Sequence, residues 1–318
     1  MARKVSIGYQ EFDDMIRGNL FYIDKTGFIK EWWDRRDKVT LITRPRRFGK
    51  TLTMDMVRKF FSIEHPENRE LFQELNIWKD PYYQEIQGKY PVISLSFSDI
   101  KENSYPQVRK KICEVIVDLY NYFYFLTEGA LLNPREKEYF YQISSEMEDS
   151  EASIALRRLS GYLYKYYGKK VIILLDEYDT PMLEAYEREY WEELATFTRS
   201  LFNATFKNNP YLERAIMTGV TRVSKESIFS DLNNLKVITT TSEEYGDCFG
   251  FTEEEVFAAL DEYGLSHKKQ EVKNWYDGFT FGNHTDIYNP WSITNFLDTG
   301  KLQPYWANTS SNHLADVL

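Results

Sequence analysis

The most informative segment of the chain reads Lys38-Val39-Thr40-Leu41-Ile42-Thr43-Arg44-Pro45-Arg46-Arg47-Phe48-Gly49-Lys50-Thr51. Its first six residues have the β-branched and apolar composition of a strand, and a helix is expected from Leu52 to Ser62. Gly49-Lys50-Thr51 matches the second half of the pattern G-x-x-x-x-G-K-[ST]. In that pattern, backbone N–H groups bind phosphate at the N-terminus of a helix. We therefore predict that Arg44 to Thr51 form a phosphate-binding loop, or P-loop.

The loop departs from the general pattern at its first position, where Arg44 stands in place of glycine. The change removes the residue with the greatest backbone freedom, and Pro45 removes one N–H donor. Against this loss, guanidinium groups bind phosphate in a fork geometry, and the loop carries three of them, on Arg44, Arg46 and Arg47. The alternative interpretation is a solvated basic loop without a ligand.

A second motif lies downstream, where the continuous apolar run Val171–Leu175 is followed by Asp176 and Glu177. Such a strand is typically buried on both faces of a parallel sheet, and its last residues reach the edge where ligands bind. In a nucleoside triphosphatase, Lys50 would reach the β and γ phosphates, whereas Thr51 and Asp176 would hold Mg²⁺. Glu177 is placed to orient and deprotonate the attacking water. Because an Asp-Glu pair also ends many surface strands, the motif gains its weight from the loop upstream.

ATPases with a catalytic Glu after this Asp usually place another strand between the two motif strands. The segment from Ala215 to Arg222 is the candidate. Its tip would present Thr218 to the γ-phosphate or to the attacking water. Arg222 would contact the γ-phosphate of its own chain or the nucleotide of a neighbouring subunit. The alternative is a core strand that ends in a surface arginine.

Strands and helices alternate along the chain, which is typical of a mostly parallel sheet covered by helices on both faces. Further strands are expected at Pro91–Phe97, Arg214–Val220 and Lys236–Thr241, and further helices at Pro106–Leu126, Ile154–Tyr167, Trp191–Phe206, Gln270–Tyr276 and Ser292–Leu297. Thr252 and Glu255 form a capping box that opens one more helix. We expect an α/β P-loop NTPase domain over residues 1–250 and a small helical subdomain over residues 251–318.

Composition limits the partners of the chain. Its formal net charge of −10 argues against a surface that coats nucleic acid, while 24 Tyr and 21 Phe allow a sizeable core. Cys113 and Cys248 form no CxxC pair, so a zinc site is not expected. No signal peptide and no apolar run of about 20 residues is found. The cytoplasm is therefore the expected compartment.

Several motifs together resemble the bacterial AAA-ATPase-like family, whose members often carry a PD-(D/E)XK nuclease-like domain at the C-terminus. The motifs are Phe21–Thr26, Arg44–Thr51, Leu174–Asp179, Thr218–Arg222, Phe229–Asn234, Trp275–Phe279 and Tyr288–Ser292. The resemblance implies that arginine at the first P-loop position is a family trait. It also implies that Lys50 and Thr51 bind phosphate and Mg²⁺, that Asp176 belongs to the metal site, and that Glu177 is catalytic. ATP is favoured over GTP on the same ground.

The nuclease-like domain of that family would follow the end of this chain. Asp261 and Glu271-Val272-Lys273 have the loose spacing of such a nuclease, but they lie in a helical pattern, whereas those enzymes place this motif on a strand. Our leading expectation is a Mg²⁺-dependent ATPase. The alternatives are a nucleotide-dependent switch with little turnover, and the ATPase part of a nucleic-acid-processing protein; a homo-oligomer stays open.

Overall fold

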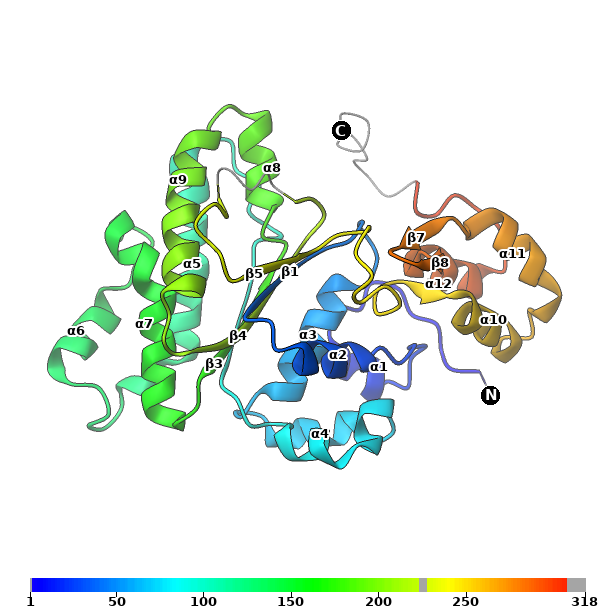
Figure 1. Ribbon diagram of the computed structural model, residues 1–318, viewed down its shortest axis with the longest axis horizontal. Helices are drawn as coiled ribbons and strands as arrows, with labels where there is room; N and C mark the ends of the chain where they lie inside the picture. Colours follow the sequence, from blue (N-terminus) through cyan, green and yellow to red (C-terminus); the bar gives the residue numbers. More distant parts are fainter. Residues whose placement is uncertain (1, 223–227, 308–318) are drawn as a thin grey trace.

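The chain folds around a five-stranded sheet in which all neighbouring strands are parallel (Figure 1). The computed structural model describes residues 2–222 and 228–307. The strand order is β2-β3-β4-β1-β5. The bounds are Val39–Thr43 for β1, Val92–Ser96 for β2, Val171–Asp176 for β3, Leu212–Gly219 for β4 and Leu235–Ile238 for β5. The predicted α/β class with a parallel central sheet is confirmed.

Strand β4 lies between β1 and β3 and pairs with both of them. Thr218 of β4 is level with Ile42 of β1, and Met217 is level with Leu175 of β3. The C-terminal ends of the three strands therefore meet at one edge of the sheet. This arrangement confirms the expectation that the strand beginning near Arg214 separates the two motif strands.

Helices cover both faces of the sheet (Figure 1). One face carries α5 (Tyr105–Tyr122), η3 (Tyr124–Thr127), α6 (Pro134–Gln142), α7 (Asp149–Tyr167), α8 (Thr180–Glu187), α9 (Trp191–Phe202) and the π-helix η4 (Asn203–Lys207). The other face carries α1 (Phe12–Arg17), α2 (Gly27–Arg35), α3 (Lys50–Phe61), η1 (Pro66–Phe72), η2 (Asn76–Lys79) and α4 (Pro81–Ile86).

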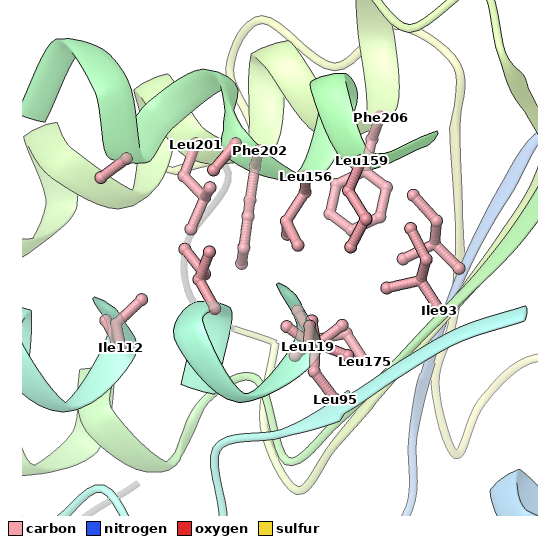
Figure 2. Close-up of a cluster of buried hydrophobic side chains, with 14 of the residues drawn as sticks. Ile93, Leu95, Ile112, Leu119, Leu156, Leu159, Leu175, Leu201, Phe202 and Phe206 are labelled. Carbon is pink, nitrogen blue, oxygen red and sulfur yellow. The ribbon is translucent and has the colours of Figure 1, made fainter. Parts of the chain in front are cut away.

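Strand β3 shows how both faces become buried, because all six of its residues are buried. Val171, Ile173 and Leu175 belong to the core beneath α5, α7 and α9, part of which is drawn in Figure 2. Ile172 and Leu174 point the other way and belong to the core beneath α1, α2 and α3. Alternation along a strand thus supplies two cores from one apolar run, as predicted for this segment.

Several expected elements end earlier than their sequence pattern suggested; α9, for example, ends at Phe202 instead of Phe206 and continues as the π-helix η4. The expected helix up to Leu126 breaks after Tyr122, and a short 3₁₀ turn follows. Strand β5 stops at Ile238 instead of Thr241. Its next residue, Thr239, donates its N–H to Ser242 Oγ and accepts a hydrogen bond from Arg44 on its carbonyl. These side-chain partners replace the pairing that a longer strand would make.

The C-terminal part contains helices, as expected, and in addition a small antiparallel sheet that the sequence pattern did not indicate. Its elements are β6 (Phe251–Thr252), α10 (Glu253–Glu262), η5 (Ser266–Lys268), α11 (Lys269–Tyr276), β7 (Phe279–Phe281), β8 (His284–Tyr288) and α12 (Pro290–Thr299). Strand order is β6-β8-β7. The capping box of Thr252 and Glu255 is present. Part of the expected subdomain, residues 308–318, lies outside the described residues.

The C-terminal part packs on residues from the start of the chain. Phe21 is buried in the same cluster as Val256 and Leu260 of α10. Two ion pairs join the same regions, Lys25 with Glu255 and Arg3 with Glu262, each at 2.7 Å. The Phe21–Thr26 motif is therefore placed between α10 and the helices of the main domain.

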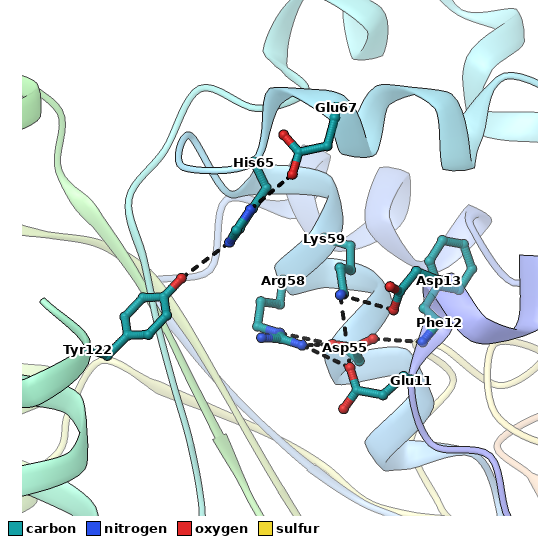
Figure 3. Close-up of polar contacts among 9 residues, drawn as sticks. All are labelled: Glu11, Phe12, Asp13, Asp55, Arg58, Lys59, His65, Glu67 and Tyr122. Carbon is teal, nitrogen blue, oxygen red and sulfur yellow. Dashed lines mark hydrogen bonds and ion pairs between the residues drawn. The ribbon is translucent and has the colours of Figure 1, made fainter. Parts of the chain in front are cut away.

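Polar contacts connect α3 to its surroundings (Figure 3). Asp55 accepts the N–H of Phe12 at 2.7 Å and pairs with Arg58, so the start of α1 is tied to α3. Just beyond the end of α3, His65 lies 3.2 Å from the hydroxyl of Tyr122. Since Tyr122 belongs to α5, this contact bridges helices that cover opposite faces of the sheet.

Candidate functional site

The backbone between β1 and α3 has the conformation of a phosphate-binding nest. Arg47 and Gly49 both adopt left-handed conformations, with φ of 68° and 80°. Within the described residues, no backbone carbonyl accepts the N–H groups of Arg47, Phe48 or Gly49. These donors precede the first residue of α3, Lys50, where the helix dipole favours an anion.

The missing first glycine is explained by the backbone at Arg44. Its φ is not positive, unlike that of Arg47 and Gly49. The position therefore makes no demand that only glycine can meet. Its N–H donates to the carbonyl of Gly219 at 3.2 Å, which ties the start of the loop to the end of β4.

The side chain of Arg44 lies elsewhere than expected. Its guanidinium is buried and donates to the backbone carbonyls of Thr43, Thr239, Glu244 and Tyr245. It also lies 4.6 Å from the centre of the Phe281 ring. Burial lowers its pKa to about 10. In this conformation the guanidinium of Arg44 holds the segment after β5 and does not point to the side of the loop where phosphate is expected. The structure therefore corrects the expectation that this guanidinium contacts phosphate.

Of the other loop side chains, two are exposed to solvent and one packs against the C-terminal part. Arg46 and Arg47 are exposed, and the guanidinium of Arg47 lies 4.3 Å from the ring of Trp291. Phe48 is buried, with its ring 4.8 Å from Phe279 and 5.3 Å from Phe281. Phe48, which occupies a position that the P-loop pattern leaves unspecified, thus anchors the loop against the β7–β8 hairpin.

Lys50 is buried within the loop that it follows. Its Nζ donates to the carbonyls of Arg44 and Pro45, each at 2.9 Å. Burial lowers the pKa of Lys50, while the carboxylates of Asp179, Asp176 and Glu177 oppose this shift. The ammonium group therefore lies between the loop backbone and the acidic end of β3, which is the region where phosphate groups are expected.

The first turn of α3 and the ends of β3 and β4 bring Thr51, Asp176 and Thr218 together. The hydroxyl of Thr51 donates to one oxygen of Asp176 at 2.7 Å. The hydroxyl of Thr218 donates to the other oxygen of Asp176. Both threonines and the aspartate supply hard oxygen atoms, the ligand type that Mg²⁺ prefers.

Glu177 directly follows this cluster and has an uncommon backbone conformation, with φ of 51°. Its N–H donates to Asp176 at 3.1 Å, and its carboxylate accepts the hydroxyl of Thr180 at 3.1 Å. The side chain is half-buried. Left-handed conformations of non-glycine residues are costly and occur often at functional sites. Arg222, three residues after the end of β4, is exposed, and residues 223–227 after it lie outside the described part.

A comparison with protein families now places the chain. A family model described as predicted AAA-ATPase matches residues 6–229, more than half of the sequence. The chain belongs to the predicted AAA-ATPase family. The match covers the P-loop, the Asp176-Glu177 strand end and β4 with its Thr218.

Nearly the whole of this predicted AAA-ATPase aligns with one part of a longer protein. An uncharacterized protein in the vnfD 5′ region of Azotobacter chroococcum mcd 1 is 28% identical over 319 residues. The alignment includes 99% of the chain and 56% of the relative, so the chain spans little more than half the length of that protein. No solved structure matches the chain. In residues 2–222 and 228–307, no helix has both the length and the apolar composition needed to cross a membrane.

The loose nuclease-like spacing in this predicted AAA-ATPase does not form a cluster. Asp261 pairs with Lys269, Glu271 pairs with Lys268, and Lys273 pairs with Glu253. Glu271 and Lys273 lie on helix α11, as the helical pattern predicted. The three residues therefore serve separate surface ion pairs.

Three residues that contact the site had no predicted role: Asp179, and Asn289 and Trp306 of the C-terminal part. Asp179 accepts the N–H groups of Val220 and Thr221 just beyond β4. In the C-terminal part, Asn289 and Trp306 donate to loop carbonyls, the latter to Arg46 at 3.1 Å. Asp179 and Asn289 stood within recognised motifs, but the C-terminal contacts join segments about 240 to 260 positions apart, so no local pattern indicated them.

Proposed function

We propose that this chain binds ATP with Mg²⁺ and hydrolyses it to ADP and phosphate. The single observation that carries the proposal is the hydrogen bond between Thr51 and Asp176, which joins the phosphate loop to the acidic strand end. Each motif alone has an ordinary structural explanation. Together they supply phosphate donors, a cation site and a carboxylate at one edge of the sheet.

The residues fit Mg²⁺ by their chemistry. Thr51 offers a hydroxyl oxygen and Asp176 offers a carboxylate, and the two lie within hydrogen-bonding distance of each other. This is the pair with which P-loop enzymes hold the ion, directly or through water. When bound, Mg²⁺ would neutralise charge on the β and γ phosphates. The preference for ATP over GTP rests on family membership.

The remaining roles belong to the side chains of the chain itself. The N–H groups of Arg47 to Gly49 would bind phosphate oxygens, and Lys50 would exchange the carbonyls of Arg44 and Pro45 for a phosphate. Glu177 would orient the attacking water and accept its proton. Thr218 and Arg222 are proposed to contact the γ-phosphate side, with Arg222 acting in its own chain or in a neighbouring subunit.

Phosphate release and nucleotide binding test this proposal when measured on the same variants. Lys50→Ala should lose both, whereas Glu177→Gln should keep ATP binding and lose turnover by about 10²- to 10⁴-fold. Glu187→Gln is a matched control, because Glu187 is an exposed carboxylate at the C-terminal end of α8, the helix that follows Glu177. Turnover unchanged in Lys50→Ala and Glu177→Gln would reject the ATPase assignment.

A second candidate is a nucleotide-dependent switch with little turnover. It is favoured by the contacts of Phe48, Asn289 and Trp306, which hold the outer side of the loop to the C-terminal part. Any change of the loop on nucleotide binding would then reach residues 279–306. Hydrogen exchange of these residues with and without ATP, in Glu177→Gln, tests the idea. Identical exchange in the two states, under saturating ATP, would count against it.

A further inference from the structure

The tip of β4, from Thr218 to Thr221, is held by the residues that follow the Asp-Glu motif. Tyr178 donates its N–H to the carbonyl of Thr218 at 3.0 Å and its hydroxyl to the carbonyl of Thr221 at 2.9 Å. Asp179 accepts the N–H of Val220 at 2.8 Å and that of Thr221 at 2.7 Å on a single oxygen. The same oxygen lies 3.1 Å from the hydroxyl of Thr221.

Asp179 occupies the N-cap position of α8 but does not cap that helix. No hydrogen bond runs from the helix to its side chain, whereas aspartate at an N-cap usually accepts an N–H of the first turn. Its carboxylate faces β4 instead. A helix-capping role therefore does not explain why a charged group is buried here to 1% exposure.

The packing around the carboxylate leaves no space for adjustment. A Cβ atom on Gly219 would lie 2.7 Å from Asp179 Oδ1 and 2.7 Å from the ring of Tyr178. Glycine at this position lets the carboxylate lie directly against the backbone of β4. The geometry therefore depends on Gly219 and Asp179 together.

The charge of Asp179 faces the phosphate-binding lysine. Burial raises the pKa of Asp179, while its hydrogen bonds from Thr221 and Val220 and the charge of Lys50 oppose the shift. Among the three nearby carboxylates, Asp179 makes the largest contribution that raises the pKa of Lys50 and so favours its charged form. The tip of β4 is thus linked to the loop through Asp179 as well as through the bond from Arg44 to Gly219.

We propose that Asp179 is a positioning residue for phosphoryl transfer, which fixes the β4 tip so that Thr218 and Arg222 stand at the γ-phosphate. The inference rests on the proposed function, because it names the residue that aligns one side of that site. Thr218 already binds Asp176 beside Thr51, so a tip that moves would misplace the polar groups nearest the cation site. Asp179 itself would touch neither nucleotide nor water.

The test compares affinity for ATP, affinity for ADP and turnover in Asp179→Ala and Asp179→Asn. Alanine should lower kcat and the preference for ATP over ADP by on the order of 10- to 100-fold, because a small misplacement has effects of this size. Affinity for ADP should fall much less than affinity for ATP, since the N–H groups of the loop backbone are untouched. Asparagine should restore most of the loss, because its amide oxygen can accept the same two N–H groups.

A second pair of variants separates positioning from stability. Gly219→Ala displaces the carboxylate without removing it and should reproduce the Asp179→Ala result, which also covers the case that Asp179→Ala does not fold. Asn209→Ala is the control, because Asn209 is buried and bonds the backbone of Tyr211 at the opposite end of β4. It should lower stability without changing kcat or the ATP preference. In Asp179→Ala, a further Thr218→Val change should have a smaller effect than in the parent protein.

Two results would overturn the inference. One is an unchanged ATP preference and kcat in both Asp179→Ala and Gly219→Ala. The other is an equal loss of ATP and ADP affinity, which would indicate a damaged loop. Failure of the proposed ATPase is a different outcome, in which the parent protein binds ATP but releases no phosphate above the Lys50→Ala background. The preference for ATP over ADP then decides the role of Asp179 by itself.

Discussion

The hydroxyl of Thr51 donates a 2.7 Å hydrogen bond to the carboxylate of Asp176, although the two residues are 125 positions apart. The contact exists because β4 spaces the two motif strands and aligns their ends. It converts two separate patterns into one set of oxygen atoms beside the phosphate loop. The first prediction follows from the loss of that hydroxyl.

Thr51→Val should weaken the dependence of nucleotide binding on Mg²⁺, whereas Thr51→Ser should not. Valine has the shape of threonine but removes the hydroxyl that donates to one oxygen of Asp176, and a hydrogen bond to a charged group contributes about 1.5–3 kcal/mol. The Mg²⁺ concentration for half-maximal ATP binding should therefore rise about tenfold or more. A Mg²⁺ titration by calorimetry measures it. Equal midpoints for Thr51→Val and Thr51→Ser would contradict the assignment.

Restoring the glycine of the general P-loop pattern should damage this protein. Arg44→Gly would remove the guanidinium hydrogen bonds to the carbonyls of Thr239, Glu244 and Tyr245 and open a cavity beside Phe281. The expected loss in the free energy of unfolding is about 2 kcal/mol or more. Urea denaturation measures the loss. Arg46→Gly is the control, since Arg46 is exposed in the same loop; an equal loss in both variants would refute the role given to Arg44.

Phe48→Ala should reduce both stability and nucleotide affinity. The ring is buried against Phe279 and Phe281, and truncating a buried Phe typically costs about 3–5 kcal/mol. Phe140→Ala is the matched control, because its ring is buried to a similar degree on the opposite face of the sheet. That variant should lose stability and keep the affinity of its folded fraction. If both variants keep full affinity, the hairpin does not support the loop.

Nucleotide affinity should fall at alkaline pH before an ordinary lysine would lose its charge. Burial lowers the pKa of Lys50, and binding of phosphate favours the charged form. Above the pKa of the free protein, Lys50 must gain a proton to bind, so the dissociation constant should rise by up to about tenfold per pH unit. Titrations between neutral and alkaline pH measure this slope. Lys50→Arg should remove it, since guanidinium stays charged, and a slope unchanged in that variant would assign the effect to other groups.

The strands of the main domain and its helices α3, α5, α7 and α9 were predictable because each one carries its own pattern. Val171–Leu175 is apolar without interruption, which is what a strand covered on both faces requires, and β3 is buried throughout. Gly49, Lys50 and Thr51 stand at a strand–helix junction, so the loop was located from three residues. The placement of β4 between β1 and β3 was predicted because ATPases with a catalytic Glu after the strand-end Asp usually place another strand between the two motif strands.

The features that were missed depend on partners far away in the chain. A buried guanidinium that binds carbonyls and an exposed one that binds phosphate look alike in sequence, so Arg44 was misplaced. The β7–β8 hairpin is short, with Phe279–Phe281 too brief for an alternating pattern to stand out. Asp179 stood at the end of a recognised motif without a role, and only the structure shows that its oxygen is turned to Val220 and Thr221.

Phe48 illustrates a consequence for how this protein can be divided. The family match ends at residue 229, yet the pocket of Phe48 is made by Phe279, Phe281 and Ile287. A Cβ atom on Gly250 would come within 3.0 Å of the Phe48 ring, so even the connection between the two parts is shaped around it. Hybrid proteins that join residues 6–229 to the C-terminal part of a distant relative would give the loop an unmatched neighbour. The phosphate loop and the hairpin are therefore expected to be inherited, exchanged and engineered as one unit.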